Sequence, residues 1–227
     1  SDVYKRQAQA VTDLRQLQWQ EHDNRILTLP FVESNRSEFL LLAQNDQYYF
    51  VSDRSGLPQL WRSHGQNTQQ ISQFKTQLAI RQLLWFHGKL LVLIDRQLYE
   101  FSEEDAQLRP FTEKLAGSER FVVCDDKLYW TSYDQKGWVL NRFEQGKIKQ
   151  LLKDVVNAEC GPGQSLVLQQ QDSHYVKQWQ QGQAMTLPVQ INWRNTAADA
   201  WASTETGLYW LSGGGTQLNY YLSLIHI

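Results

Sequence analysis

An internal repeat of about 40 residues constrains this chain more than any other feature of its sequence. Five short segments share one pattern, in which a polar or small residue leads into an aromatic or aliphatic run. They begin 42, 38, 37 and 43 residues apart, at residues 47–52, 89–94, 127–132, 164–169 and 207–212. A fixed period of this length is typical of repeat architectures, in which each unit is one supersecondary element.

Further strand-like runs flank each shared segment. A second run follows it, a third follows in the first four units, and another precedes it across a turn such as His87-Gly88 or Asp125-Asp126. Helical repeats have similar periods, but here the apolar positions are β-branched and aromatic, and Gly, Asp or Asn punctuates them. Four antiparallel strands per unit is the pattern of a β-propeller blade.

The sequence therefore predicts an all-β fold, an incomplete β-propeller of four-stranded antiparallel blades, with about five and a half blades present. A β-sandwich of many short strands is the alternative. The predicted propeller covers 8–222, with a partial blade at 8–33, complete blades at 36–74, 77–113, 117–152 and 155–188, and another partial blade at 191–222. Within 8–33, the spacing of Val11, Leu14 and Leu17 also fits a helix, although we favour strands.

Composition limits the function classes. The 22 Lys and Arg residues nearly balance the 24 Asp and Glu residues, so the surface is not built to neutralise phosphates or anionic lipid. No apolar run approaches the ~20 residues that span a bilayer. A hydrophobic fraction of 41% is too high for a disordered chain. We expect a folded domain that binds no nucleic acid and does not insert into a membrane.

The two cysteines, Cys124 and Cys160, lack the spacing of a zinc or redox motif. They fall at equivalent positions in consecutive units, at the end of the first strand. Because neighbouring blades diverge towards the rim of a propeller, we expect their Cα atoms to lie beyond the ~7 Å limit for a bridge. Two free thiols are therefore predicted, with a single disulfide as the alternative.

No catalytic or cofactor motif is present in the sequence. A Gly-x-Ser-x-Gly nucleophile elbow is absent, which argues against acyl transfer. The histidines do not have the spacing of metal ligands; they are His22, His64, His87, His174 and His226. We expect no enzymatic activity, no cofactor and no metal site.

One segment carries a family resemblance. Residues 50–61, Phe-Val-Ser-Asp-Arg-Ser-Gly-Leu-Pro-Gln-Leu-Trp, resemble the repeat of the TolB-like propellers, a relative of the WD repeats. The resemblance extends over about 36–222 and is diffuse outside the first complete blade. Physically the motif is structural, because Gly56 suits a tight turn, Asp53 can bond turn amides and Trp61 supplies packing area.

Among proteins with such propellers, the Gln-rich composition, 29 of 227 residues, looks most like the periplasmic sensory region of CadC-like or ToxR-like transcriptional regulators. That resemblance implies a periplasmic location, an upstream winged-helix domain and a transmembrane helix that anchors the full-length protein in the inner membrane. Residues 1–7 and 223–227 resemble translated adapter sequence at the ends of genes assembled from environmental DNA. We expect these ends to be non-native and the chain to be a metagenomic fragment.

The predicted function is that of a non-enzymatic sensory or protein-interaction propeller, whose partner is a protein or a small-molecule signal. Two alternatives stay open: a TolB-type interaction propeller of the cell envelope with no attached transcription factor, and the non-catalytic propeller of an oligopeptidase.

The loops that join the second and third strands hold dense polar groups in four consecutive blades. If these loops surround one mouth of the central channel, they form a binding face on a rigid scaffold; otherwise they are solvated turns. The candidate binding residues are Asp53, Arg54, Asp95, Arg96, Asp134, Lys136, Asp172 and His174.

Overall fold

The computed structural model of the chain describes residues 9–11, 38–65, 67–115, 120–171, 175–180, 182–190, 201–203, 207–212 and 217–222. The chain divides into two compact units, and each is described by itself. Unit 2 is Asp23–Phe121, and unit 1 combines Ser1–His22 with Val122–Ile227. The described residues form strands, apart from turns and a 3-10 turn at Pro162–Gln164. No helix among them is long and apolar enough to cross a membrane.

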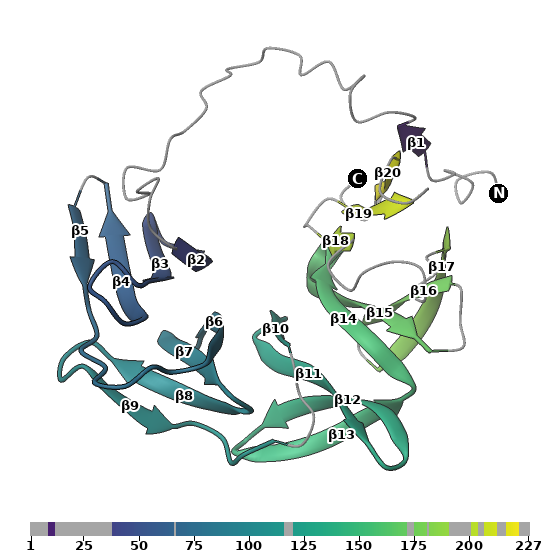
Figure 1. The fold of residues 1–227 in the computed structure, drawn as a ribbon. Coiled ribbons are helices and arrows are strands. Elements are labelled where there is room, and N and C mark those ends of the chain that lie inside the picture. The colour runs from purple at the N-terminus through teal and green to yellow at the C-terminus, as the bar shows by residue number, and fades with distance from the viewer. Residues whose placement is uncertain are drawn as a thin grey trace. The chain divides into compact units, whose positions relative to one another are not determined.

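Unit 2 contains two four-stranded antiparallel sheets in which each strand pairs with the next along the chain (Figure 1). The first sheet consists of β2 (Glu38–Gln44), β3 (Gln47–Ser52), β4 (Gln59–His64) and β5 (Asn67–Gln70). The second consists of β6 (Ile80–Phe86), β7 (Lys89–Ile94), β8 (Gln97–Ser102) and β9 (Gln107–Pro110).

Unit 1 repeats the same sheet twice. One sheet consists of β10 (Phe121–Cys124), β11 (Lys127–Asp134), β12 (Gly137–Glu144) and β13 (Lys147–Lys153). The next consists of β14 (Val155–Gly161), β15 (Ser165–Gln170), β16 (Tyr175–Gln180) and β17 (Gln183–Gln190).

The last sheet of unit 1 uses strands from both ends of the chain. It consists of β18 (Trp201–Ser203), β19 (Gly207–Ser212), β20 (Gln217–Leu222) and β1 (Gln9–Val11). β1 runs antiparallel to β20, with Gln9 opposite Tyr220. Part of the segment predicted as a partial blade at 8–33 thus supplies a fourth strand here, and residues 12–33 lie outside the described residues.

The predicted fold, an incomplete all-β propeller of four-stranded antiparallel blades, is confirmed. The second strand of each blade is the shared segment of the repeat, and β3, β7 and β19 begin and end where the pattern does. The blade boundaries proposed from the sequence stay predictions.

Local chemistry explains the strands and their turns. Leu90, Leu91, Val92 and Leu93 of β7 are all buried, since the second strand is covered on both faces. Among the described residues, four two-residue hairpin turns have positive φ at both positions, which is the type I′ geometry that matches strand twist. These turns are Asn45-Asp46, His87-Gly88, Asp125-Asp126 and Gln145-Gly146.

Each unit has its own apolar core between neighbouring sheets. In unit 2 the core includes Tyr49, Val51, Leu60, Ile80, Leu83, Leu90, Val92 and Phe101. In unit 1 it includes Val122, Cys124, Tyr129, Leu140, Val155, Ala158, Leu166 and Leu168. Both cores draw on two blades, so blade packing defines the fold.

The expectation of two free thiols is wrong. Cys124 and Cys160 form a disulfide, and their Cα atoms lie 5.2 Å apart. The error came from assuming that neighbouring blades have already diverged at this point. Both cysteines lie on the first strands of neighbouring sheets, β10 and β14, and β14 packs directly against β11 and β12 of the other sheet.

Candidate functional site

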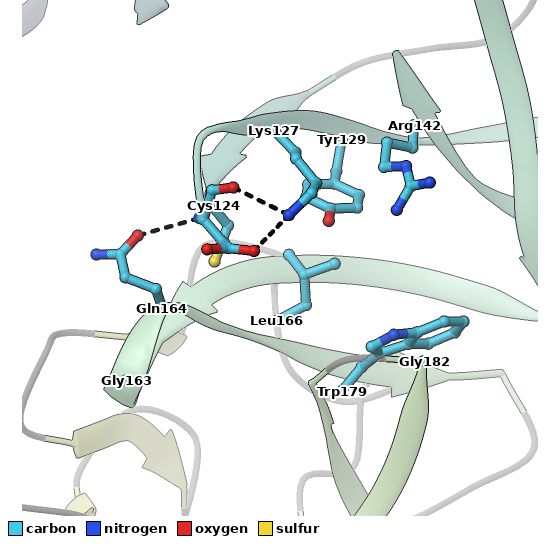
Figure 2. A pocket seen from close by; sticks show the side chains of 10 residues that line it. Cys124, Lys127, Tyr129, Arg142, Gly163, Gln164, Leu166, Trp179 and Gly182 are labelled. Carbon is cyan, nitrogen blue, oxygen red and sulfur yellow. Dashed lines mark hydrogen bonds and ion pairs between the residues drawn. The ribbon is translucent and has the colours of Figure 1, made fainter. Parts of the chain in front are cut away.

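A pocket of about 240 Å³ opens between two sheets of unit 1, the β10–β13 sheet and the β14–β17 sheet, beside the disulfide (Figure 2). Strands β10–β12 form one side, and β15, β16 and their adjoining turns form the other. The lining residues are Cys124, Asp125, Lys127, Tyr129, Arg142, Gly163, Gln164, Leu166, Trp179 and Gly182.

One side of the pocket, the polar wall, is formed by Lys127, Tyr129 and Arg142. Lys127 and Tyr129 are two residues apart on β11 and therefore share a face of the sheet. Arg142 on β12 is the direct cross-strand partner of Tyr129. Figure 2 shows the three side chains in a row. Register alone thus places two cations and a phenol on one wall.

Each cation of the polar wall has one carboxylate neighbour. The Lys127 ammonium pairs with the Asp125 carboxylate and donates to the Asp125 carbonyl at 3.2 Å. The hydrogen bond with Asp125 raises the pKa of Lys127. The Arg142 Nη2 atom lies 2.7 Å from Glu144 Oε2, and this hydrogen bond lowers the pKa of Glu144.

Arg142 keeps an unused donor. Burial lowers its pKa, but hydrogen bonds with Glu144 and Tyr129 outweigh that effect and hold the pKa above its ordinary value. The Arg142 Nε atom is buried and has no hydrogen-bond partner among the described residues. A buried donor without an acceptor is unfavourable.

The opposite side, the apolar wall, is formed by Leu166 and Trp179. Leu166 on β15 pairs across the sheet with Trp179 on β16. Leu166 is buried and Trp179 is half-buried. In Figure 2 both side chains lie across the pocket from Lys127 and Tyr129.

Two links join the blades at the pocket. The disulfide connects Cys124 to Cys160, and the Asp125 backbone N–H donates to Gln164 Oε1 at 3.1 Å. These links fix the separation of the polar and apolar walls. The arrangement suits binding of a small molecule that has both an anionic and an apolar part. Within the ranges that the structure describes, no cluster of three His, Cys, Asp or Glu residues could hold a metal ion.

The predicted candidates in unit 2 lie in the expected loops and are engaged within their own blades. The Asp53 carbonyl accepts from the Gly56 N–H at 2.7 Å, and Gly56 has φ +104°. The Arg54 guanidinium lies 5.6 Å from the Phe50 ring centroid and 4.7 Å from that of Trp61, in cation–π geometry.

The second pair of candidates in unit 2 follows β7. The Asp95 carboxylate pairs with Lys114 at 2.7 Å, and the Arg96 carbonyl accepts from the Leu115 N–H at 2.8 Å. Both residues are exposed. The Asp95 side chain thus already forms an ion pair within its own blade.

The remaining four candidates belong to unit 1. Asp134 is the last residue of β11, and Lys136 is exposed in the following turn. Asp172 and His174 lie outside the described residues. The ring of loops stays a prediction.

Sequence reasoning missed the pocket residues Lys127, Tyr129, Arg142 and Trp179. A signal existed, because Tyr49 and Arg62 have the same 13-residue spacing as Tyr129 and Arg142. Because the second and third strands of each blade are predicted to form a hairpin, this spacing places a tyrosine opposite an arginine once in each of two blades. The space beside the second pair depends on the next blade, which the spacing does not reveal.

Comparison with known proteins identifies the fold and no more. No family model matches the chain, and no curated protein matches it in sequence. Among solved structures, TolB from Acinetobacter baumannii is 15% identical with a TM-score of 0.56, over 85% of this chain and 56% of that one.

Virginiamycin B lyase from Staphylococcus aureus is 12% identical with a TM-score of 0.52, over 85% of this chain and 72% of that one. The extracellular domain of the putative one component system BT4673 from B. thetaiotaomicron is 11% identical with a TM-score of 0.50, over 86% of this chain and 29% of that one. These similarities support the propeller fold.

Proposed function

We propose that this chain is a non-enzymatic, extracytoplasmic sensory propeller, and that it forms the periplasmic region of a membrane-anchored transcriptional regulator. The observation that carries the proposal is the Cys124–Cys160 disulfide beside a pocket with a polar and an apolar wall. Disulfides form and persist in oxidising compartments such as the periplasm. The location agrees with the resemblance of the repeat to TolB-like propellers.

The sensory role is supported by the chemistry of the pocket. Its polar groups are two cations, a phenol, an amide and one carboxylate that is paired with Lys127. Hydrolysis by a side-chain nucleophile needs that nucleophile next to a base, and the lining contains no serine, threonine or histidine to form such a pair. We infer that these pocket side chains bind a ligand and do not catalyse its chemical conversion.

The link to transcription rests on the sequence resemblance. An extracellular domain of a one component system shares the fold, but at 11% identity that likeness concerns fold alone. A TolB-type interaction propeller and an oligopeptidase propeller would share the same blades, so the experiment must separate the three.

The location is tested by exporting the chain to the periplasm of a Gram-negative host, blocking free thiols and mapping peptides by mass spectrometry. A linked peptide pair from Cys124 and Cys160 is expected. Recovery of both cysteines as alkylated thiols would contradict an extracytoplasmic protein.

The role is tested in the full-length gene with a transcriptional reporter. Arg142→Gln should abolish the response, whereas Lys75→Gln, at an exposed position of unit 2, should not. Equal responses from both variants would favour an interaction propeller. Peptide hydrolysis by the full-length protein would favour the oligopeptidase.

A further inference from the structure

The junction between the two blades of unit 2 contains the same pair of residues as the pocket. Tyr49 on β3 is the cross-strand partner of Arg62 on β4, as Tyr129 on β11 is of Arg142 on β12. Each tyrosine is the third residue of its strand, after Gln47 or Lys127 at the first position. The two pairs are therefore equivalent.

In unit 2 a carboxylate from the next blade occupies the space beside this pair. The Tyr49 hydroxyl donates to Glu103 Oε1 at 3.2 Å, and Arg62 Nη1 lies 2.6 Å from Glu103 Oε2. Glu103 belongs to the turn between β8 and β9. Unit 2 thus shows how a tyrosine and an arginine at these positions hold a carboxylate.

An aromatic ring from the same neighbouring blade completes that junction. Trp85 on β6 stacks on Tyr49, with ring centroids 5.6 Å apart and an interplanar angle of 29°. The carboxylate and the ring together fill the space against Tyr49.

In unit 1 the position that corresponds to Trp85 carries a smaller side chain. Trp85 belongs to the second residue pair from its hairpin turn, Trp85–Leu90, and the second pair in the next blade of unit 1 is Cys160–Leu166. The turn after the third strand, which carries Glu103 in unit 2, contributes Gly182 to the pocket lining. The pocket therefore lies beside the Tyr129–Arg142 pair, as Trp85 and Glu103 lie beside the Tyr49–Arg62 pair.

We propose that the pocket binds a small monocyclic aromatic carboxylic acid, an inference that rests on the sensory role proposed above. The carboxylate takes the place of Glu103 and accepts hydrogen bonds from Tyr129 and Arg142, with Lys127 adjacent. The ring takes the place of Trp85 and packs against Leu166 and Trp179.

The volume and the charge of the pocket limit the class of ligand further. A volume of about 240 Å³ is below the ~300–1,000 Å³ of pockets for drug-sized ligands, so one ring is the fitting size. Arg142 prefers a planar carboxylate that can accept two hydrogen bonds. An uncharged amide of the same shape lacks the charge and brings an N–H₂ group towards two cations.

The test compares 3-phenylpropionate with 3-phenylpropionamide by isothermal titration calorimetry on the oxidised chain. The acid should bind with one site per chain, and the amide should bind about ten- to hundredfold more weakly, as expected for losing a charged hydrogen bond. Equal binding of acid and amide, or no binding of the acid, would overturn the ligand class.

Variants locate the bound acid. Arg142→Gln should weaken it about ten- to hundredfold and Tyr129→Phe about fivefold, whereas Lys75→Gln in unit 2 should leave it unchanged. Tyr129→Phe keeps the ring in the core, so it reports on the hydroxyl even if Arg142→Gln lowers stability. Unchanged affinity in both pocket variants would place the acid elsewhere and refute the proposal.

Failure of the ligand class can be told from failure of the proposed function. If the cysteines form a disulfide in the periplasm and the reporter depends on Arg142, but 3-phenylpropionate does not bind, the ligand class is wrong and the sensory role stands. If the acid binds through Arg142 but the exported protein keeps free thiols or the reporter ignores Arg142, the site stands and the proposed role is wrong.

Discussion

Two blade junctions, one in each unit, share the same cross-strand tyrosine–arginine pair but fill the space beside it differently. The Tyr49 junction of unit 2, formed by Tyr49, Arg62, Trp85 and Glu103, is filled by large side chains from the next blade. The disulfide junction of unit 1, formed by Tyr129, Arg142, Cys124 and Cys160, is cross-linked instead, and it contains the pocket.

The difference shows how a propeller can acquire a binding site without losing the attachment between blades. Side chains that fill a junction stabilise it in proportion to the area they bury, so removing them weakens the contact. A disulfide acts mainly by restricting the unfolded chain and needs little volume in the folded one. A covalent link therefore permits an unfilled space that packing alone would not.

The largest effect is expected from removing the covalent link. Cys124 and Cys160 are 36 residues apart, and the Cys124→Ala/Cys160→Ala variant should lose about 4 kcal/mol of unfolding free energy. Urea denaturation of the whole chain, monitored by hydrogen exchange of the amides of unit 1, measures this loss. The wild type under reducing conditions should match the variant, and an unchanged midpoint in the variant would contradict the assigned role.

A somewhat smaller effect is expected from emptying the Tyr49 junction. Trp85 is half-buried against Tyr49, and Trp85→Ala should cost about 3 kcal/mol. The matched substitution Trp179→Ala in the pocket wall should cost less, because one face of that indole borders open space. Equal urea midpoints for the two variants would break the contrast between a filled and an unfilled junction.

The pH dependence of the Tyr49 junction should be smaller again. Burial raises the pKa of Tyr49, and the charge and hydrogen bond of Glu103 raise it further. The unfolded chain therefore ionises this tyrosine first, and its contribution is complete below pH 10 and is lost as pH rises through the raised pKa.

Denaturation of the wild type and Tyr49→Phe between pH 9 and about 11 measures that contribution. The wild type should lose stability more steeply than Tyr49→Phe, and Glu103→Gln should lie between them. Identical slopes for all three proteins would show that Tyr49 is not held as described.

The smallest expected effect concerns the competing partner of Arg142. Glu144 is exposed and pairs with Arg142 Nη2, so Glu144→Gln should free the guanidinium and tighten binding of 3-phenylpropionate about twofold. Titration calorimetry measures the change, with Glu104→Gln, an exposed acidic residue of unit 2, as the control. Weaker binding in Glu144→Gln would mean that this carboxylate positions Arg142 rather than competing for it.

The fold was predictable because its signals are local. The runs that became β3, β7 and β19 are continuous in sequence, and pairs such as His87-Gly88 end them with the turn geometry that hairpins require. Contacts between blades are not local. The sequence places Cys124 and Cys160 at matching positions, but the 5.2 Å between their Cα atoms depends on how closely β10 and β14 approach.

The candidate site shows the same limit. The spacing of Tyr129 and Arg142 fixes their register within one hairpin, whereas Trp179 reaches the pocket from the adjacent blade. The loop residues were predicted as a binding face because they are polar. In the structure, the Arg54 guanidinium lies over the Trp61 ring and the Asp95 carboxylate pairs with Lys114, so both side chains have partners within their own blades. Polar character alone does not separate a ligand-binding side chain from one that closes a turn.

The pairing of β1 with β20 has a consequence for how the protein is made. Gln9 leaves the ribosome 211 residues before Tyr220, its partner in the last sheet. At ~5–20 residues per second, the first strand waits roughly 10–40 seconds before its partner exists. Until then β1 has no partner from the last sheet, and unpaired strand edges attract other strands. Correct folding of this chain should therefore depend on what shields β1 during synthesis.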